Sequence, residues 1–321
     1  MLIVNSSASE ATPTGVLVLN NELYVSDPVA GQIKVYDAST MSQTPVRSLA
    51  LVNVRLLDYD SQGFIWMLDT VQKKLIRFST TGEIQPQSIT FPSNVVPTSF
   101  CVDKTNDRIL VTNNGNDQNM LIYTSIFGTP SQTSTFGNLG GINSGAAGAI
   151  APLKFSEPKG VGIDSAGNIF VGNNGIWGGA RLEKYNSSDS LQWRLNGNVF
   201  TANGSLNPSD ETEFYTHDHK FKLNPGNTTP GSEWSLAAQT VNKVKYPGDI
   251  RIPPAAGTTV TPPYGEFWTT GYTRIIAGKK ILFTSNMYGS VIGIHRFNAT
   301  TDGETAIPSG WMTKFDNRPL A

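Results

Sequence analysis

The chain has 321 residues, with 24 Lys and Arg residues against 25 Asp and Glu residues. This near-neutral balance offers no electrostatic attraction to nucleic acids or anionic membranes, so we expect neither as a partner. Only 15% of the residues are charged, against about 25% in an average soluble domain, while 31 Gly and 19 Pro residues supply many turns. The composition therefore predicts a turn-rich β protein rather than a disordered one.

Neither the apolar runs nor the single cysteine points to a membrane span or a disulfide. The longest apolar runs, such as residues 15–19, are far shorter than the roughly 20 residues that cross a bilayer. Cys101 lies in an apolar, strand-like run, which predicts a buried structural thiol.

The first residues lack the basic and apolar regions of a signal peptide. Low charge with abundant Thr, Ser, Asn and Gly still favours an exported protein, periplasmic or extracellular, and we expect a monomer.

Short β-like segments recur along the chain in a constant order. In each unit an apolar strand ends on Asp or Asn, a polar or Gly-containing loop follows, and the next strand closes with an aromatic residue. A further strand-like segment precedes most of these pairs, and each unit has room for a weaker fourth strand. Units of this kind occupy residues 23–37, 65–79, 110–124, 169–186 and 282–298, with a degenerate copy at residues 214–224.

The length of the repeat predicts the fold. Units of about 40 residues with four strands are typical of a β-propeller, because one small sheet cannot bury both faces and must stack on its neighbours. We therefore predict an all-β fold, a six-bladed β-propeller of four-stranded antiparallel blades. Residues 1–321 are expected to form a single domain, with a Pro-rich insertion at about residues 224–268 in the fifth blade.

One segment carries a family resemblance. Residues 155–171 read Phe-Ser-Glu-Pro-Lys-Gly-Val-Gly-Ile-Asp-Ser-Ala-Gly-Asn-Ile-Phe-Val. They resemble an NHL-repeat blade, whose pattern is Phe-x-x-Pro-x-Gly-Val-Ala-hydrophobic-Asp-x-x-Gly-Asn-Ile-Tyr-Val; the other units carry fragments of it. Within the segment, Asp164 to Asn168 predict a hairpin turn in which Gly167 adopts a positive φ and the polar side chains bond back to the backbone.

A ring of oxygen-bearing side chains is the first candidate site. The same strand position in every blade of a propeller comes near the same end of the central channel. Oxygen ligands suit Ca²⁺ or another divalent cation, and a resemblance to six-bladed calcium-dependent propeller hydrolases and lyases implies the same. The alternative is that each side chain caps a loop by accepting backbone N–H groups. The candidate metal ligands are Asp27, Asp69, Asn113, Asn173, Asn286 and, in the degenerate unit, Asp218.

Two of the three histidines form a second candidate site. His217 and His219 share one face if their segment is an extended strand, because side chains alternate with a period of two. There they could bind a transition metal, or one could act as a general base beside Asp218. A surface or structural role is the alternative. The third histidine, His295, aligns with charged residues of two other units, so we expect it to point outward into solvent.

Exposed aromatic residues form a third candidate. The Pro-rich insertion breaks the repeat, and long insertions on a rigid scaffold are often functional. Aromatic rings beside Asn, Asp and Gln suit a sugar-binding surface, although they could also pack the insertion onto its blade. The candidate ligand-binding residues are Trp234, Tyr264 and Trp268 in the insertion and Trp177 on a Gly-rich loop.

Two functions remain open. The sequence contains no nucleophile elbow, P-loop, dinucleotide fingerprint or zinc-protease motif. The first function is an exported, NHL-like binding module that recognises a glycan or a protein partner on its loop face. The alternative is a metal-dependent hydrolase or lyase at the mouth of the channel, with the oxygen ring holding the cation and His217 or His219 as acid or base. Whether the protein is an enzyme is left open.

Overall fold

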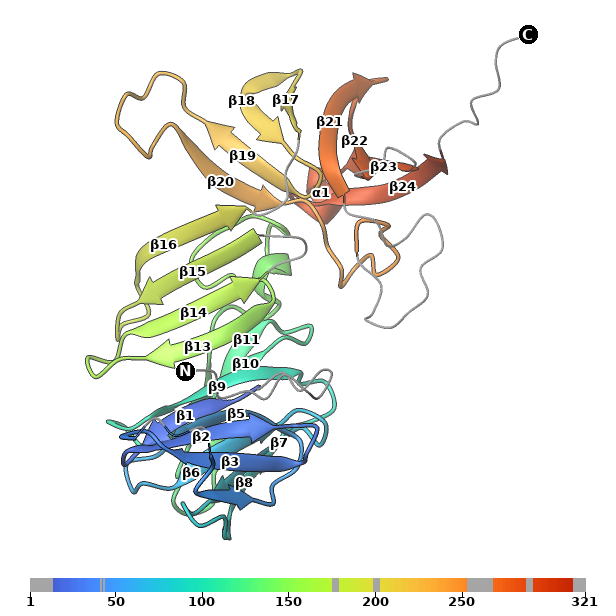
Figure 1. Cartoon of the computed structure of the whole chain (residues 1–321). Helices are drawn as coiled ribbons and strands as arrows, with labels where there is room; N and C mark the ends of the chain where they lie inside the picture. Colours follow the sequence, from blue (N-terminus) through green and yellow to red (C-terminus); the bar gives the residue numbers. More distant parts are fainter. Residues whose placement is uncertain are drawn as a thin grey trace. The chain divides into compact units, whose positions relative to one another are not determined.

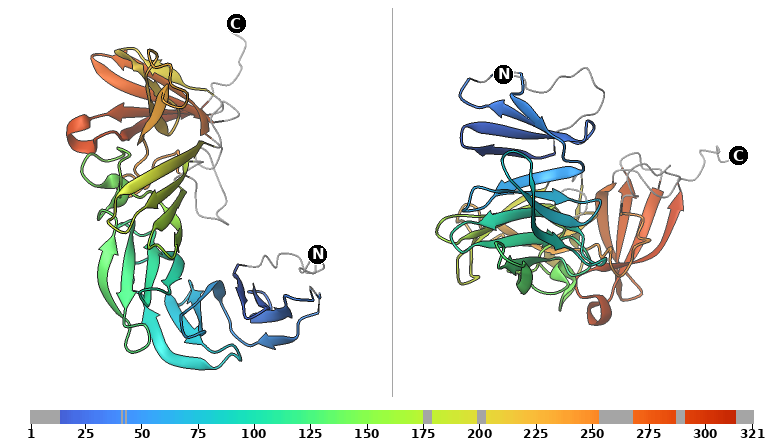
Figure 2. Two further views of the ribbon diagram at one scale, coloured as in Figure 1. Left: turned by 90° about the vertical axis from the view of Figure 1, so that its left-hand side faces the viewer. Right: turned by 90° about the horizontal axis from the view of Figure 1, so that it is seen from below.

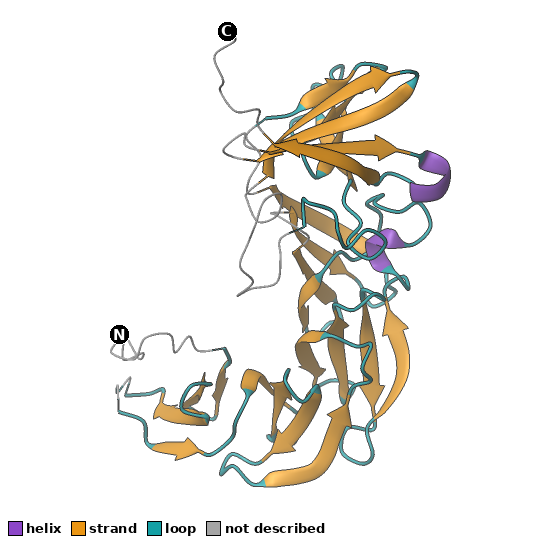
Figure 3. Cartoon of the chain, turned by 90° about the vertical axis from the view of Figure 1, so that its right-hand side faces the viewer, coloured by secondary structure: helices purple, strands orange, loops and turns teal. Residues whose placement is uncertain are grey.

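The structure is almost entirely β. A computed structural model describes residues 14–40, 42, 44–174, 179–198, 203–252, 268–286 and 291–313. Within them the chain forms strands β1 to β24 and two short helical turns, η1 (Gly141–Asn143) and α1 (Ala299–Asp302) (Figure 3). None of the helices in these ranges is long and apolar enough to cross a membrane.

The strands form six four-stranded sheets, which we call blades 1 to 6. In each blade the strands follow chain order, as β13 to β16 show most clearly in Figure 1; Figure 2 gives two further views. This confirms the predicted fold class, all-β with the six four-stranded antiparallel blades of a β-propeller.

Blades 1 to 3 comprise β1 (Val16–Leu19), β2 (Glu22–Asp27), β3 (Gln32–Asp37), β4 (Arg47–Leu49), β5 (Val54–Tyr59), β6 (Ile65–Asp69), β7 (Lys74–Phe78), β8 (Ile84–Thr90), β9 (Pro97–Asp103), β10 (Arg108–Asn113), β11 (Asn119–Thr124) and β12 (Ser131–Phe136). Blades 4 to 6 comprise β13 (Pro158–Ile163), β14 (Ile169–Asn174), β15 (Gly179–Tyr185), β16 (Leu191–Asn198), β17 (Ser205–Asn207), β18 (Asp210–Tyr215), β19 (His219–Leu223), β20 (Trp234–Gln239), β21 (Trp268–Ile276), β22 (Lys279–Asn286), β23 (Val291–Phe297) and β24 (Ala306–Thr313).

The chain divides into two compact units. The prediction that it forms a single domain stays a prediction. The first unit contains Met1–Gly137, Pro158–Gly172 and Leu182–Arg194, and the second contains Asn138–Glu157, Asn173–Arg181 and Leu195–Ala321.

In the first unit, neighbouring blades bury their apolar faces against each other. Every residue of β6, which reads Ile-Trp-Met-Leu-Asp, is buried, because one face packs on blade 1 and the other on blade 3. Ile65 belongs to the core shared with blade 1, and Trp66 to the core shared with blade 3. Further on, the rings of Phe136 and Tyr185 meet edge to face with centroids 5.2 Å apart. A strand with consecutive apolar residues is therefore the expected signature of a blade covered on both sides.

In the second unit, blades 5 and 6 share a smaller core. Tyr215 of β18 packs against Phe297 of β23 with ring centroids 5.4 Å apart. Thr273 of β21 donates its backbone N–H to the Ser205 side chain at 2.7 Å. At Gly271 the approach is so close that a Cβ atom would lie 2.4 Å from the backbone of Thr216, so no larger residue fits there. One face of blade 6 therefore packs directly on blade 5.

The structure confirms the predicted turn of the NHL-like segment and the burial of the cysteine. Asp164 Oδ1 accepts the backbone N–H groups of Ala166 and Asn168 at 3.1 and 2.8 Å, and Gly167 has a φ of 78°. Cys101 is buried in β9, and burial raises the pKa of its thiol far above the usual range. An uncharged, enclosed thiol fits the predicted structural role.

The predicted insertion is shorter than expected. Its first part, residues 224–233, is the hairpin loop that joins β19 to β20, and β20 is the fourth strand of blade 5. Prolines and glycines in this loop hid the strand that follows it. The segment outside the blades begins after β20, and the structure describes it to residue 252. The sequence also gave no signal for the short strand β17.

Candidate functional site

The predicted oxygen-bearing residues lie at equivalent places in their blades. Asp27, Asp69 and Asn113 are the last residues of β2, β6 and β10, and Asn173 is the last but one of β14. Asn286 is the last residue of β22, but its side chain lies outside the described part of the structure. Asp218 departs from the pattern, because it follows the end of β18 in a turn.

The described side chains of this set that lie at strand ends accept backbone N–H groups, whereas Asp218 Oδ1 accepts the Thr216 hydroxyl. Asp69 Oδ1 accepts the N–H groups two and three residues further on, each at 2.8 Å. Asp27 accepts one at 2.9 Å and pairs with Lys34 at 2.7 Å. Asn113 and Asn173 each accept an N–H from the loop before the first strand of their blade, at 3.0 and 2.9 Å. Within the described ranges, no three His, Cys, Asp or Glu residues converge as metal ligands. These are the contacts of the loop-capping alternative, and the cation ring stays a prediction.

The variant Asp69→Ala separates capping from cation binding. Asp69 is 1% exposed, and its loss removes the acceptor of the backbone N–H groups of Val71 and Gln72 in the exposed loop that follows. We expect the free energy of unfolding to fall by about 1–3 kcal/mol, the range for the loss of hydrogen bonds to a charged group. Urea unfolding with CaCl2 or with EDTA should give the same loss. A wild-type stability that drops with EDTA, and a variant that no longer responds, would contradict the capping role.

The two adjacent histidines flank a tight turn rather than sharing a strand face. The backbone N–H of Thr216 donates to the carbonyl of His219 at 2.9 Å, which closes a turn through His217 and Asp218. Thr216 Oγ1 stabilises this turn by donating to Asp218 Oδ1 at 3.1 Å and accepting the His219 N–H at 3.1 Å. The local side-chain bonds of Thr and Asp therefore compete with an extended strand here.

The turn is buried and incompletely hydrogen-bonded. His217, Asp218 and His219 are 0%, 1% and 4% exposed. Asp218 Oδ1 lies 3.4 Å from His217 Nε2 and 2.8 Å from His219 Nδ1, but the geometry of neither contact is that of a hydrogen bond. Among the described residues, neither ring nitrogen of His217 has a hydrogen-bond partner. Burial lowers the pKa of His217 to about 4, so the ring is neutral at pH 7. The geometry brings an acid and two imidazoles together, but encloses them.

A buried ion pair supports the turn from the segment after β20. Asp249 Oδ2 lies 2.7 Å from Arg251 Nη2, and both side chains are fully enclosed. Arg251 Nη1 donates to the carbonyl of His217 at 2.9 Å. Although burial opposes it, the Arg251 guanidinium lowers the pKa of Asp249. Sequence reasoning missed this pair; the available signal was an Asp and an Arg two positions apart in a segment of low charge.

The expectation for His295 is wrong. Its side chain is 0% exposed, and its Nε2 lies 3.0 Å from Thr284 Oγ1. Burial and the nearby Arg251 lower the pKa of His295 well below its ordinary value. The reason is that alternate residues of β23, His295 among them, lie on the face of blade 6 that packs on blade 5. The repeat alone had predicted that this position is exposed to solvent. Glu183, at the equivalent place in β15, is also buried.

The candidate aromatic residues have different environments. Trp177 and Tyr264 lie outside the described residues. Trp268 is 2% exposed, packs with Ile250 and Val291, and donates its indole N–H to the Ile250 carbonyl at 2.9 Å. It therefore belongs to the core instead of a ligand-binding surface. Trp234 is 51% exposed at the start of β20.

Trp234 belongs to a row of apolar side chains on one face of blade 5. Phe214 pairs with Phe221 across β18 and β19, and Leu223 pairs with Trp234 across β19 and β20. The Phe221 ring lies 6.1 Å from that of Phe214 and 5.5 Å from that of Trp234. We call Phe214, Phe221, Leu223 and Trp234 the blade 5 aromatic face. It is opposite to the face that carries Tyr215 and packs on blade 6.

Asp210 and Thr212 share the face of Phe214, because the three residues alternate along β18. Asp210 Oδ2 lies 3.1 Å from Lys222 Nζ, and Asp210 Oδ1 accepts the Thr212 backbone N–H at 3.0 Å. Bonds from Thr212 and Lys222 lower the pKa of Asp210 to about 2, so it is ionised at neutral pH. The hairpin loop between β19 and β20, which leads into Trp234 (Figure 1), contains Asn, Thr and Ser residues. Sequence reasoning missed Phe214, Phe221 and Asp210, because they meet Trp234 only through strand pairing.

Comparisons with known proteins place the chain near several solved structures. No known family profile matches the chain. No curated protein matches it either. Hydrazine synthase of Kuenenia stuttgartiensis is 9% identical, with 92% of this chain and 81% of that chain covered and a TM-score of 0.43. Virginiamycin B lyase from Staphylococcus aureus is 14% identical, with 90% and 82% covered and a TM-score of 0.38. A protein of unknown function from Bacteroides caccae is 10% identical, with 90% and 93% covered and a TM-score of 0.38.

Proposed function

We propose that this chain is an NHL-like β-propeller binding module that recognises a glycan on the blade 5 aromatic face. The observation that carries the proposal is the half-exposed Trp234, held edge-on by Phe221, with Asp210 on the same face of the blade. An exposed Trp anchored by a second ring is a rigid platform rather than a mobile side chain.

The chemistry of this face fits a sugar. A pyranose ring presents C–H groups on its faces and hydroxyls around its edge, so it needs a flat apolar surface with polar groups beside it. Trp234 and Leu223 supply the apolar surface. The ionised Asp210 accepts hydroxyl donors of the ligand. In the described structure the indole N–H of Trp234 has no protein acceptor, so it can donate to the ligand.

The variant Trp234→Ala tests the proposal. We expect a soluble polysaccharide that retards the wild-type protein in affinity electrophoresis to retard this variant at least tenfold less, because the stacking surface is gone. The probes are β-glucan, xylan, mannan and pectin. The melting temperature should change little, since half of the side chain is already in solvent.

The matched control is Trp311→Ala, which removes a Trp of 49% exposure from blade 6. It should leave retardation unchanged. Equal retardation of the wild type and Trp234→Ala by every retained polysaccharide would contradict the proposal. Retention of a protein partner, but of no glycan, would favour a protein-binding module instead.

The rival function, a metal-dependent hydrolase or lyase, depends on the turn at His217 and Asp218. A general base must reach a proton of its substrate, and His217 is fully buried within the described residues. The oxygen-bearing residues at the strand ends are engaged by backbone N–H groups. The binding module is therefore the better-supported function. Metal analysis of the purified protein, with its melting temperature before and after chelation, tests the rival directly.

We also propose that the protein is exported. The proposal rests on the low charge and the abundance of polar uncharged residues, both of which suit a glycan-binding surface outside the cell. Fractionation of cells that express the full gene should find the protein outside the cytoplasm; a purely cytoplasmic protein would contradict it.

A further inference from the structure

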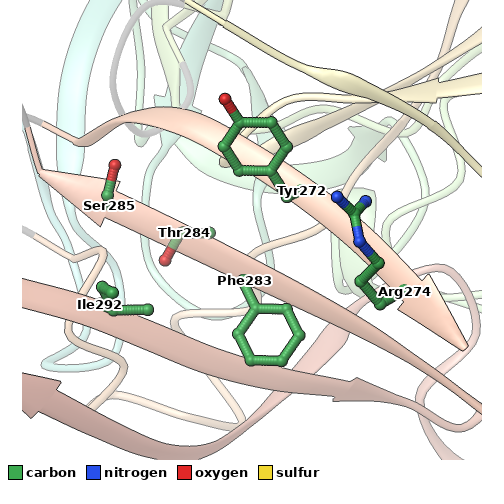
Figure 4. A pocket seen from close by; sticks show the side chains of 6 residues that line it. All are labelled: Tyr272, Arg274, Phe283, Thr284, Ser285 and Ile292. Atoms are coloured by element: carbon green, nitrogen blue, oxygen red, sulfur yellow. The ribbon is translucent and has the colours of Figure 1, made fainter. Parts of the chain in front are cut away.

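The face of blade 6 that points away from blade 5 contains a pocket. Its volume is about 470 Å³, within the range of roughly 300–1,000 Å³ common for small-ligand sites. Residues of β21, β22 and β23 line it (Figure 4). The lining residues are Tyr272, Arg274, Phe283, Thr284, Ser285 and Ile292.

Strand register arranges this face in rows of different chemistry. Tyr272 pairs with Phe283, so their two rings form the centre of the face. Ser285 pairs with Ile292 on one side of that row. On the other side, Ile281 lies between Arg274 on β21 and Arg296 on β23, because it pairs with both. An aromatic row therefore lies between a basic row and a hydroxyl-bearing row.

This face is separate from the surfaces described above. Thr273, next to Arg274 on β21, donates its hydroxyl to the Leu206 carbonyl of blade 5 at 2.8 Å. Neighbouring residues of a strand point to opposite faces, so Tyr272 and Arg274 point away from blade 5. The pocket is therefore independent of the proposed glycan site, and Trp234→Ala should leave it unchanged.

The basic row carries charge that the described residues do not neutralise. Arg274 is exposed, and its Nη1 donates a hydrogen bond to the Thr273 carbonyl at 2.7 Å. Its guanidinium lies 5.9 Å from the centre of the Tyr272 ring. Arg296 is exposed as well. Within the described ranges neither guanidinium pairs with a carboxylate, whereas Lys280 on the opposite face pairs with Glu213 at 3.5 Å. An unpaired guanidinium beside two rings fits an anionic ligand with a flat apolar body.

We propose that this pocket binds a small aromatic carboxylic acid. The ring of the ligand lies against Tyr272 and Phe283, where aromatic pairs prefer offset or edge-on contacts. The carboxylate accepts the remaining N–H groups of Arg274, whose planar fork matches its two oxygens. Ser285 supplies a hydroxyl at the far side of the rings, and Ile292 an apolar wall.

Three matched probes test the two halves of this proposal on the full chain. 3-Phenylpropionate carries ring and charge, 3-phenylpropan-1-ol keeps the ring without the charge, and propionate keeps the charge without the ring. Titrations followed by NMR should show 3-phenylpropionate binding at least tenfold more tightly than either of the others. Equal affinity for the alcohol, or no binding of the acid at millimolar concentration, would overturn the proposal.

The variant Arg274→Gln removes the charge while keeping a side chain of similar length. Its affinity for 3-phenylpropionate should fall about 10- to 100-fold, as for loss of a charged hydrogen bond, and its affinity for the alcohol should not change. The control Arg55→Gln makes the same change at an exposed residue of β5 and should bind like the wild type. Wild-type affinity in Arg274→Gln, or an equal loss in Arg55→Gln, would also overturn the proposal.

Discussion

The variant Asp249→Ala should unfold with a free energy about 3–5 kcal/mol lower than that of the wild type, which is the usual cost of removing one partner of a buried ion pair. The reason is that Arg251 is 0% exposed and loses the carboxylate that lies 2.7 Å from its Nη2. The same guanidinium bonds to the carbonyls of His217, Thr240 and Ala306, so its displacement also disturbs the turn after β18 and the start of β24. Urea unfolding followed by tryptophan fluorescence measures the change.

The matched control is Asp210→Ala, which removes the carboxylate of an exposed pair with Lys222. Exposed ion pairs contribute little to stability, so its urea midpoint should stay close to that of the wild type. A loss below about 1 kcal/mol for Asp249→Ala, no larger than the control shows, would mean that the buried pair does not hold this part of the second unit together.

Lowering the pH should destabilise the protein at pH values well above those at which carboxylates become protonated. Burial lowers the pKa of His217 to about 4 and that of His295 well below the ordinary value of 6.5. Below pH 6.5 the unfolded chain therefore binds protons that the folded chain does not. The stability that the two neutral histidines contribute is fully present above pH 6.5 and is lost as the pH falls toward 4. Each histidine contributes up to about 1.4 kcal/mol per pH unit, and the pair up to about 2.7.

Urea midpoints at pH 7, 6, 5 and 4.5 measure this slope. The variant His295→Gln should reduce the slope by about half, because it removes one of the two titrating groups. Asp218 and Asp249 also have lowered pKa values, and they add to the loss only near and below their ordinary value of 3.8. A stability that does not change between pH 7 and pH 5 would contradict the account of buried neutral histidines.

The fold could be predicted because its signals are local. The run from Ile65 to Leu68 is apolar at every position, is followed by the loop-capping carboxylate of Asp69, and has counterparts in the same order in the other units. Counting such units gave six blades without any knowledge of their contacts. The shorter β17 and the strand β20 were missed, because one is only Ser205–Asn207 and the other follows a loop rich in Pro and Gly.

The candidate sites were less predictable, because they depend on which face of a strand is covered. Trp234 and Trp268 look alike in the sequence, yet one is 51% exposed and the other 2%. His295 was expected in solvent and lies in the core between blades 5 and 6. These outcomes are set by the neighbouring blade and by the register across strands, which bring together residues distant in sequence, such as Phe214 and Trp234 with Phe221.

The most direct test of the central claim is a glycan array probed with labelled wild-type protein and with Trp234→Ala. The account predicts that the wild type binds a defined set of glycans and that the variant loses all of them while remaining folded, because every bound sugar needs the Trp234 ring. Absence of any bound glycan, or the same set of glycans bound by both proteins, would contradict the claim that blade 5 carries a glycan-binding face.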